Sequence, residues 1–224
     1  MNLIMTMCFS DKNLPLYELC RPTQINYAKK TNCDYLTLYN EIDYGFLKKA
    51  NIYRNKIRCL DYLKIYDRVL FLDGDVMINK HAGDIFAAYP KTDTFYAWTT
   101  DDENMLKCLP AYNLKKQFYF NGGVYLIGKD CNMQYNPKDY QEVSGWDEVF
   151  MNYIIQTNGV NYESLSAKWN RMSCNDVNGV FIYDSNFIHF GGHGWSKLTN
   201  KGLRKEMELD KYKIAETIYR RINV

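Results

Sequence analysis

The chain has 224 residues, of which 46% are hydrophobic and 24% are charged. This balance is typical of a folded protein with a sizeable core and excludes a disordered or fibrous chain. The 28 basic and 26 acidic residues are spread along the sequence and leave a formal net charge of only +2, which disfavours a nucleic-acid partner.

Cysteine content and the apolar N-terminus bear on the location of the protein. The chain has seven cysteines, an odd number, with no CxxC pair and no secretory signal, a pattern that predicts reduced thiols inside a cell. The apolar stretch at residues 1–9 lacks a basic flank and is too short to span a bilayer. We therefore expect a cytoplasmic protein with no membrane span, folded as one domain over residues 1–224.

Short apolar runs alternate with stretches of helical spacing in the first part of the chain. They predict a strand at 3–9, a helix at 14–30, a strand at 35–39, a helix at 50–66 and a strand at 68–72. The last of these strands is almost continuously apolar, as expected for a strand buried on both faces. The alternation predicts an α/β fold with a mostly parallel central sheet flanked by helices.

The later elements are predicted in the same way. They are a helix at 82–89, strands at 94–99 and 123–127, a helix at 147–156, a strand at 187–190 and a helix at 203–220. Internal repeats, low-complexity segments and Pro/Gly-rich linkers are all missing from the sequence, which agrees with a single domain.

The predicted strand at 68–72 ends abruptly at the tripeptide Asp73-Gly74-Asp75. Ligands of open α/β sheets bind beyond the carboxyl ends of the strands, so the tripeptide lies where a ligand is expected. Two carboxylates separated by one small residue can bind a hard divalent cation directly or through water, and Gly74 lets the backbone come close. A surface turn is the alternative, because Asp and Gly are favoured turn residues.

Four segments, in order along the chain, resemble one known family. Residues 66–76 (YDRVLFLDGDV) are similar to the metal-binding strand of glycogenin-like glycosyltransferases, family eight in sequence classifications. Residues 120–127 resemble that family's FN(S/G)GV segment, residues 146–152 its helix with DQ and a downstream Asn, and residues 189–192 the start of its HFxGxxKPW motif. The resemblance covers roughly residues 1–200, and its specificity lies in these four segments.

The resemblance implies a GT-A fold, a UDP-sugar donor, a glycan or glycoprotein acceptor, and manganese or magnesium held by Asp73, Asp75 and His189. It implies that residues 1–100 mainly bind the nucleotide sugar and the metal. Residues 101–200 would mainly serve the acceptor and supply a C-terminal metal and phosphate loop, and residues 201–224 would form a C-terminal helix. The compact length also resembles small glycosyltransferases encoded by large algal DNA viruses.

The segment after His189 departs from the family pattern in one respect. Its glycines, Gly192 among them, could present amides to a phosphate, and Lys197 could offer a charge to the pyrophosphate leaving group. The family has its Lys six residues after the His, whereas that position is Trp195 in this sequence and Lys197 comes two residues later. His193 therefore competes with His189 as the metal ligand, and a lone His can also be a hydrogen-bonded core residue.

Two acidic residues and an Asn-Gly pair are the candidates for chemistry at the sugar. Asn121 and Gly122 could offer an amide and an open backbone to sugar or acceptor hydroxyls, although Asn-Gly is also a common turn. Asp147 and Glu148 begin a predicted helix, where the helix dipole alone favours acidic residues. The family has Gln where this sequence has Glu148, so we name Glu148, with Asp147, as candidate catalytic residues, base or nucleophile.

Three more residues are candidates for binding the nucleotide and its phosphates. Ser10 and Asp11 lie in the first strand-to-helix loop, where the family holds the base and ribose, although the residue-level match is poor. Lys56 precedes the Asp73 strand and could contact a phosphate, although basic residues on a helix are often only solvated.

The sequence favours a glycosyltransferase over two alternatives. A sugar nucleotidyltransferase would also use acidic metal ligands, but it should show a Gly-rich, basic signature after the first strand, which residues 8–12 lack. A non-catalytic nucleotide-sugar-binding module would hold its ligand without releasing UDP. The sugar itself is selected by a few side chains whose positions the sequence does not give.

Overall fold

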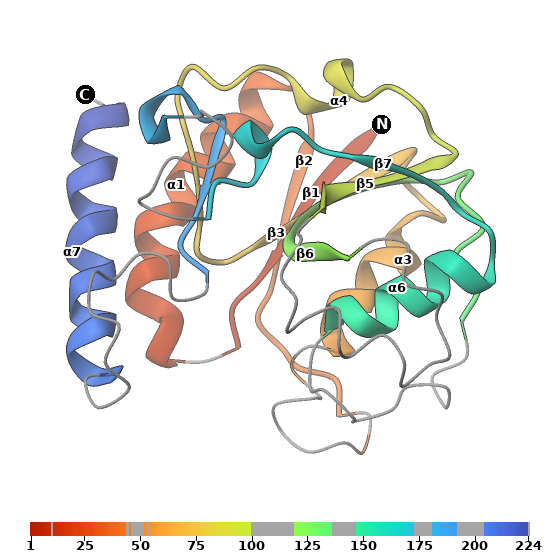
Figure 1. The fold of residues 1–224 in the computed structure, drawn as a ribbon, viewed down its shortest axis with the longest axis horizontal. Helices are drawn as coiled ribbons and strands as arrows, with labels where there is room; N and C mark the ends of the chain where they lie inside the picture. Colours follow the sequence, from red (N-terminus) through yellow and green to blue (C-terminus); the bar gives the residue numbers. More distant parts are fainter. Residues whose placement is uncertain are drawn as a thin grey trace.

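The computed structural model describes residues 1–9, 11–43, 45, 52, 54–99, 119–135, 147–172, 181–191 and 204–223. Its central element is a six-stranded sheet with the strand order β2-β1-β3-β6-β5-β7 (Figure 1). In chain order these strands are β1 Asn2–Met7, β2 Asp34–Leu38, β3 Arg68–Asp73, β5 Thr94–Thr99, β6 Phe120–Gly128 and β7 Asn161–Ser164.

The strand directions confirm the predicted mostly parallel sheet. Strand β1 is parallel to both β2 and β3, and β5 is parallel to β7. The exception is β6, which runs antiparallel to its neighbours β3 and β5. Because Leu72 of β3 pairs with Val124 of β6, the first residues of β6 lie next to the end of β3.

A second, two-stranded sheet connects two distant parts of the chain. It pairs β4 Val76–Ile78 with β8 Phe187–His189 in antiparallel register, so that Val76 lies opposite His189. The backbone N–H of Phe190 extends this pairing by donating to the carbonyl oxygen of Asp75 at 3.0 Å. Strand β4 follows β3 almost directly, so the small sheet brings β8 to the end of the central sheet.

Helices cover both faces of the central sheet. Helix α1 (Leu14–Lys30) packs beside α7 (Arg204–Asn223), while α3 (Cys59–Tyr62) and α6 (Asp147–Thr157) lie on the other side of the sheet (Figure 1). The remaining helical elements are α4 (Ile85–Ala88) and 3-10 turns at Asp11–Asn13, Asn55–Arg58, Ala167–Trp169 and Ile182–Asp184. Within the described ranges, no helix has both the length and the apolar character needed to cross a bilayer.

Side chains of β3 alternate between two apolar clusters, one on each face of the sheet. Val69 and Phe71 belong to the cluster that includes α3 and α6, and Leu70 and Leu72 belong to the cluster that includes α1 and α4. All four are fully buried, as the two-residue period of a strand requires when both faces are covered. The prediction that this strand is buried on both faces is therefore confirmed.

Two helices are shorter than the sequence indicated. The continuous helix predicted at 50–66 is wrong, because in its described part a 3-10 turn precedes α3 and α3 ends at Tyr62. The buried side chain of Asn55 bonds both backbone groups of Ile42, at 2.9 and 3.0 Å, so a tertiary contact competes with regular helix. The helix predicted at 82–89 shrinks to α4, since Asp84 caps it by accepting from the N–H groups of Phe86 and Ala87.

Other strand boundaries also differ from the sequence expectation. Strands β4 and β7 have three and four residues and were not predicted, because so short a run carries no clear period. Strand β6 begins at Phe120, ahead of the predicted strand at 123–127. Asn121 and Gly122 are therefore strand residues at the end of the central sheet, and they do not form the turn that Asn-Gly often makes.

Candidate metal centre at the end of the central sheet

The turn from β3 to β4 carries two carboxylates on a tightly packed backbone. Asp73 is the last residue of β3, and Asp75 directly precedes β4. A Cβ atom added at Gly74 would lie 3.0 Å from the carbonyl oxygen of Met7 and 3.2 Å from Tyr17 Cδ2. Glycine therefore allows the turn to pack tightly against β1 and α1, with both carboxylates at the carboxyl end of the sheet.

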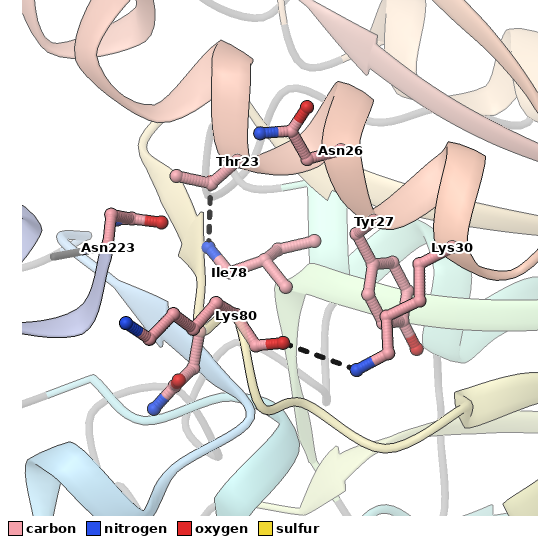
Figure 2. A pocket seen from close by; sticks show the side chains of 8 residues that line it. Thr23, Asn26, Tyr27, Lys30, Ile78, Lys80 and Asn223 are labelled. Atoms are coloured by element: carbon pink, nitrogen blue, oxygen red, sulfur yellow. Dashed lines mark hydrogen bonds between the residues drawn. The ribbon is translucent and has the colours of Figure 1, made fainter.

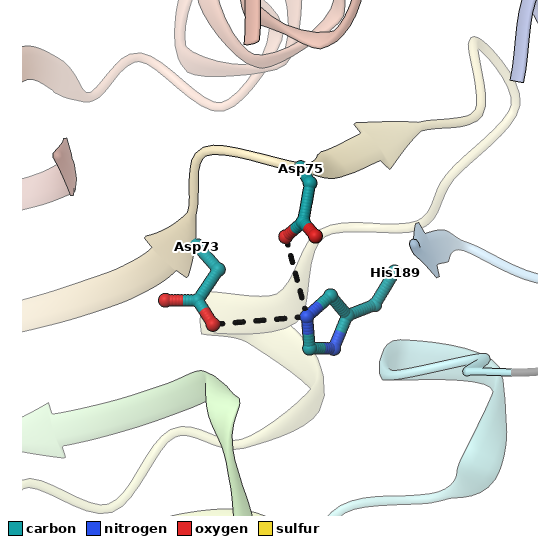
Figure 3. A group of neighbouring side chains, drawn as sticks. All are labelled: Asp73, Asp75 and His189. Carbon is teal, nitrogen blue, oxygen red and sulfur yellow. Dashed lines mark ion pairs between the residues drawn. The ribbon is translucent and has the colours of Figure 1, made fainter. Parts of the chain in front are cut away.

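His189 meets these carboxylates from β8. Its Nε2 lies 3.3 Å from Asp75 Oδ1 and 3.7 Å from Asp73 Oδ2 (Figure 3). One ligand atom from each of the three residues lies within 4.8 Å of the others. Among the residues described, no other group of three His, Cys, Asp or Glu side chains comes this close together. The predicted trio of Asp73, Asp75 and His189 thus comes together.

Glycines on two strands make room for the imidazole ring. A Cβ atom at Gly123 would lie 2.0 Å from His189 Cε1, and one at Gly191 would lie 2.4 Å from His189 Nε2. Both distances are impossible for real atoms, so each glycine is needed where it stands. The ring itself is 3% exposed, which means that its position is set by the surrounding chain.

A residue that the sequence analysis did not single out, Asn170, contacts the same ring. His189 Nδ1 lies 3.0 Å from Asn170 Oδ1, and Asn170 Nδ2 donates to Asn121 Oδ1 at 2.9 Å. Asn121 Oδ1 also accepts from the backbone N–H of Gly123 at 3.0 Å. A buried Asn after a short 3-10 turn has no sequence signal of its own, and only the fold brings it to His189.

Lys56 contributes a buried positive charge beside Asp73. Its Nζ lies 2.8 Å from Asp73 Oδ1 and donates to the carbonyl oxygen of Gly122 at 3.3 Å, and its side chain is 5% exposed. The ion pair therefore connects the end of β3 to the start of β6.

The electrostatics of the two carboxylates differ. Burial raises the pKa of Asp73, and the charge of Asp75 adds to this effect, while Lys56 and His189 oppose it. Burial also acts to raise the pKa of Asp75, but the charge and hydrogen bond of His189 outweigh it, and that pKa is lowered. The repulsion between the two carboxylates favours positive charge between them, and Lys56 and His189 already supply part of it.

Glu148 supplies a third carboxyl group close to Gly122. The side chain projects from α6, is buried, and accepts the backbone N–H of Gly122 through Oε1 at 3.3 Å. Its other oxygen, Oε2, has no hydrogen-bond partner among the described residues. A buried carboxyl oxygen without a partner is costly, which makes Glu148 a candidate for contact with a substrate.

Solved structures of similar fold cover nearly the whole chain, although the sequence matches no protein-family model and no curated protein. A glycosyltransferase involved in glycosylation of the major capsid of PBCV-1 aligns with a TM-score of 0.63 at 13% identity, over 96% of this chain and 98% of that one. The galactosyltransferase LgtC, solved with donor and acceptor sugar analogues, gives 0.55 at 13% identity, over 100% and 97%. Mouse xyloside xylosyltransferase 1 gives 0.54 at 12% identity, over 87% and 99%.

The chain has the GT-A glycosyltransferase fold. The prediction made from four short segments is thereby confirmed for the fold. Because these identities are only 12% and 13%, the likeness carries no information about the substrate.

Some of the predicted site residues lie together in the GT-A fold, and others fall outside the described residues. The contacts above link seven of the predicted residues: Asp73, Asp75, His189, Lys56, Asn121, Gly122 and Glu148. Asp11 lies in an exposed 3-10 turn, and Asp147 begins α6, with its side chain outside the described part. Ser10, Gly192, His193 and Lys197 also fall outside the described residues, so the choice between His189 and His193 is tested only for His189, which reaches both carboxylates.

The donor atoms of the GT-A centre fit a divalent cation. An octahedral ion bound at about 2.0–2.1 Å places neighbouring ligand atoms roughly 3 Å apart, close to the separations of 3.3 and 3.7 Å seen from His189 Nε2. Carboxylates suit both magnesium and manganese, whereas an imidazole favours a transition metal. The residues present therefore accommodate a metal without rearrangement of the backbone.

A small hollow elsewhere on the fold is separate from the candidate metal centre. It has a volume of about 110 Å³ and is lined by residues of α1, of the 78–80 segment and of the end of α7 (Figure 2). Ligand sites for molecules of drug size measure about 300–1,000 Å³, and this hollow shares no residue with the Asp73, Asp75 and His189 cluster. Its Lys30 ammonium already donates to the carbonyl oxygens of Lys80 and Ala82, at 3.2 and 2.7 Å.

Proposed function

We propose that the chain is a metal-dependent glycosyltransferase that moves a sugar from a UDP-sugar donor to a glycan or glycoprotein acceptor. The observation that carries the proposal is the cluster of Asp73, Asp75 and His189 at the carboxyl end of β3. Ligands of open α/β sheets bind at this edge. The three compared structures are all glycosyltransferases, which supports the same class of reaction.

Asp73, Asp75 and His189 would hold the cation, and their mixed oxygen and nitrogen donors favour manganese over magnesium. When bound, the cation would neutralise the diphosphate of the donor and stabilise it as a leaving group. The ion pair between Lys56 and Asp73 fixes one ligand before any donor arrives. We therefore assign Lys56 to holding Asp73 in place, in addition to the phosphate contact predicted from sequence.

Glu148 is the proposed catalytic carboxylate. Glu148 accepts the N–H of Gly122, and Lys56 donates to the carbonyl oxygen of the same residue. Only Gly122 of β6 therefore separates Glu148 from the ion pair of Lys56 and Asp73. A carboxylate there can accept the proton of an acceptor hydroxyl or attack the anomeric carbon. Asp147 precedes it on α6 and remains a candidate.

The acceptor and the location of the protein are separate parts of the proposal. A glycan or glycoprotein acceptor is proposed from the resemblance of the four sequence segments; one of the three compared proteins is itself involved in glycosylation of the major capsid of PBCV-1. Four further points stay predictions. They are the resemblance to enzymes of large algal viruses, the cytoplasmic location, the roles assigned to successive parts of the chain, and the contacts of the donor with Ser10, Asp11, Gly192 and Lys197.

The proposal is tested by a screen of nucleotide sugars for release of UDP with and without manganese. Asp73→Asn and Asp75→Asn should each lower donor turnover roughly 10²-fold or more, because each removes a negative ligand from the cation. Asp61→Asn, at an exposed carboxylate on α3, serves as the control and should keep full turnover.

Each alternative function gives a different result in this screen. A binding module would retain a nucleotide sugar without releasing UDP. A nucleotidyltransferase would also release no UDP from it, but would form pyrophosphate when given UTP and a sugar 1-phosphate. Near-normal turnover of either Asp73→Asn or Asp75→Asn at limiting manganese would show that the metal site is assigned wrongly.

A further inference from the structure

A chain of hydrogen bonds runs from the Gly123 N–H through Asn121 and Asn170 to His189, and the Gly123 N–H fixes which atom donates at each step. The backbone N–H of Gly123 can only donate, so the Asn121 atom that it meets must be the amide oxygen. That oxygen only accepts, so the Asn170 atom facing it must be the amide nitrogen. The other amide atom of Asn170, which faces His189 Nδ1 at 3.0 Å, is then an oxygen.

An amide oxygen opposite a ring nitrogen requires that nitrogen to carry the hydrogen. His189 is therefore held with its hydrogen on Nδ1, and in the neutral ring the lone pair lies on Nε2. Nε2 is the atom that faces Asp75 Oδ1 and Asp73 Oδ2. In the neutral ring three acceptors thus converge on one point, an arrangement that a divalent cation satisfies, whereas the protonated ring would instead donate from Nε2 to Asp75.

The residues around His189 hold its imidazole ring in one position. Gly123 and Gly191 closely flank the imidazole, and Asn170 is only 1% exposed. The backbone next to Asn170 is tied to β8 as well, because Arg171 N–H donates to Phe187 O at 3.0 Å and His189 N–H donates to Arg171 O at 2.9 Å. The amide of Asn170 and the ring of His189 are therefore held in fixed relative positions.

We propose that Asn170 is a positioning residue that fixes the metal-binding tautomer of His189, an inference that rests on the proposed function in taking the ligand to be a divalent cation. Asn170 itself touches no metal or substrate in this scheme. It acts through His189, and Asn121 sets the direction of its amide. Partners of this kind behind a metal-binding His typically change metal affinity by about 10- to 100-fold when removed.

The test compares two buried asparagines that make similar bonds. Asn170→Ala removes the acceptor of His189 Nδ1. Asn79→Ala is the matched control, because Asn79 is buried, and its side chain donates to Tyr183 O at 2.9 Å and accepts from His81 N–H at 3.0 Å, bonds that involve neither Asp73, Asp75 nor His189. Two quantities are measured on each protein: the tautomer of neutral His189 without metal, by ¹⁵N NMR, and the affinity for Mn²⁺ alone, by calorimetry.

The expected result is an Nδ1–H tautomer in the wild-type chain and in Asn79→Ala. Asn170→Ala should lose that preference and bind Mn²⁺ about 10- to 100-fold more weakly, while Asn79→Ala keeps the wild-type affinity. An Nε2–H tautomer in the wild-type chain would overturn the inference, and so would an Asn170→Ala affinity equal to that of Asn79→Ala.

A second variant keeps the test decisive if Asn170→Ala does not fold. Asn170→Asp retains an oxygen opposite Nδ1, so His189 should keep the Nδ1–H tautomer, and an Nε2–H tautomer in this variant would overturn the inference. Failure of the wild-type chain to bind Mn²⁺ would instead count against the proposed function, since the tautomer is measured without metal.

Discussion

The two sides of the candidate metal centre are built in different ways. The carboxylate side, Asp73 and Asp75, is set by three consecutive residues at the end of one buried strand. The histidine side, His189 with Asn170 and Gly123, is assembled from three segments that are far apart in the sequence and meet only in the folded chain. The carboxylates are therefore placed by local structure, whereas the histidine depends on packing and hydrogen bonds contributed by other elements.

The two sides should therefore respond differently to substitutions. A substitution on the carboxylate side should act mainly when it changes a ligand or one of the two residues that support it, Gly74 and Lys56. On the histidine side, residues that bind nothing themselves should matter as much as the ligand. Three experiments examine this contrast, in order of decreasing expected effect.

The largest effect is expected from Gly123→Ala. The new methyl group would overlap the His189 ring, with a Cβ to Cε1 distance of 2.0 Å, so the ring must leave its place and its bond to Asn170. We expect Mn²⁺ affinity, measured by calorimetry, to fall roughly 100-fold or more. Gly83→Ala is the control, since its Cβ would meet Trp169 at an ordinary 3.7 Å.

A double-mutant cycle shows whether the ring is the cause. In a His189→Ala background the overlap disappears, so Gly123→Ala should cost much less stability there than in the wild-type chain. Equal costs in both backgrounds would mean that Gly123 serves the backbone of β6 and not the histidine side.

Glu148→Gln tests whether the α6 carboxylate beside Gly122 takes part in chemistry. Gln keeps the shape and the acceptor for the Gly122 N–H but cannot readily take a proton near neutral pH. If Glu148 is base or nucleophile, the variant should lose roughly 10²-fold in kcat with little change in donor affinity.

Product stereochemistry, followed by NMR, should accompany these kinetics. The family resemblance implies retention of anomeric configuration, whereas a general base at this position would support inversion. A fully active Glu148→Gln variant would leave Glu148 with a structural role only.

The smallest effect is expected from Asp84→Ala, which removes a helix cap remote from both sides of the centre. Asp84 Oδ1 accepts from the N–H groups of Phe86 and Ala87 at 2.8 and 3.3 Å, and loss of such a cap costs about 1 kcal/mol. Chemical denaturation should show this loss with unchanged Mn²⁺ affinity. A drop in affinity would show that the histidine side responds to stability in general and not to its own contacts.

The same contrast explains how much of the molecule could be predicted from the sequence. The apolar run of β3, the tripeptide Asp73-Gly74-Asp75 and helix α1, predicted and found at Leu14–Lys30, all carry strong local signals. His189 was predicted through a family resemblance, because nothing local distinguishes it from a core histidine.

The remaining parts of the site have no local signal. Asn170 is recognised only when β8 and the turn at Ala167–Trp169 are seen together. The burial of Lys56 and the short strand β4 also depend on tertiary contacts, which periodicity does not report.

The small sheet of β4 and β8 has a consequence for the C-terminal helix. Val76, Ile78 and Phe187 face the cluster on the central sheet, whereas Met77 and Ile188 face the cluster formed with α7. Asp75 and His189 sit at one end of this same ladder, so the proposed cation and α7 would both be held by one thin layer. Thermodynamic linkage is reciprocal: loosening α7 should weaken the hold on the cation, and saturation with the cation should slow hydrogen exchange in α7.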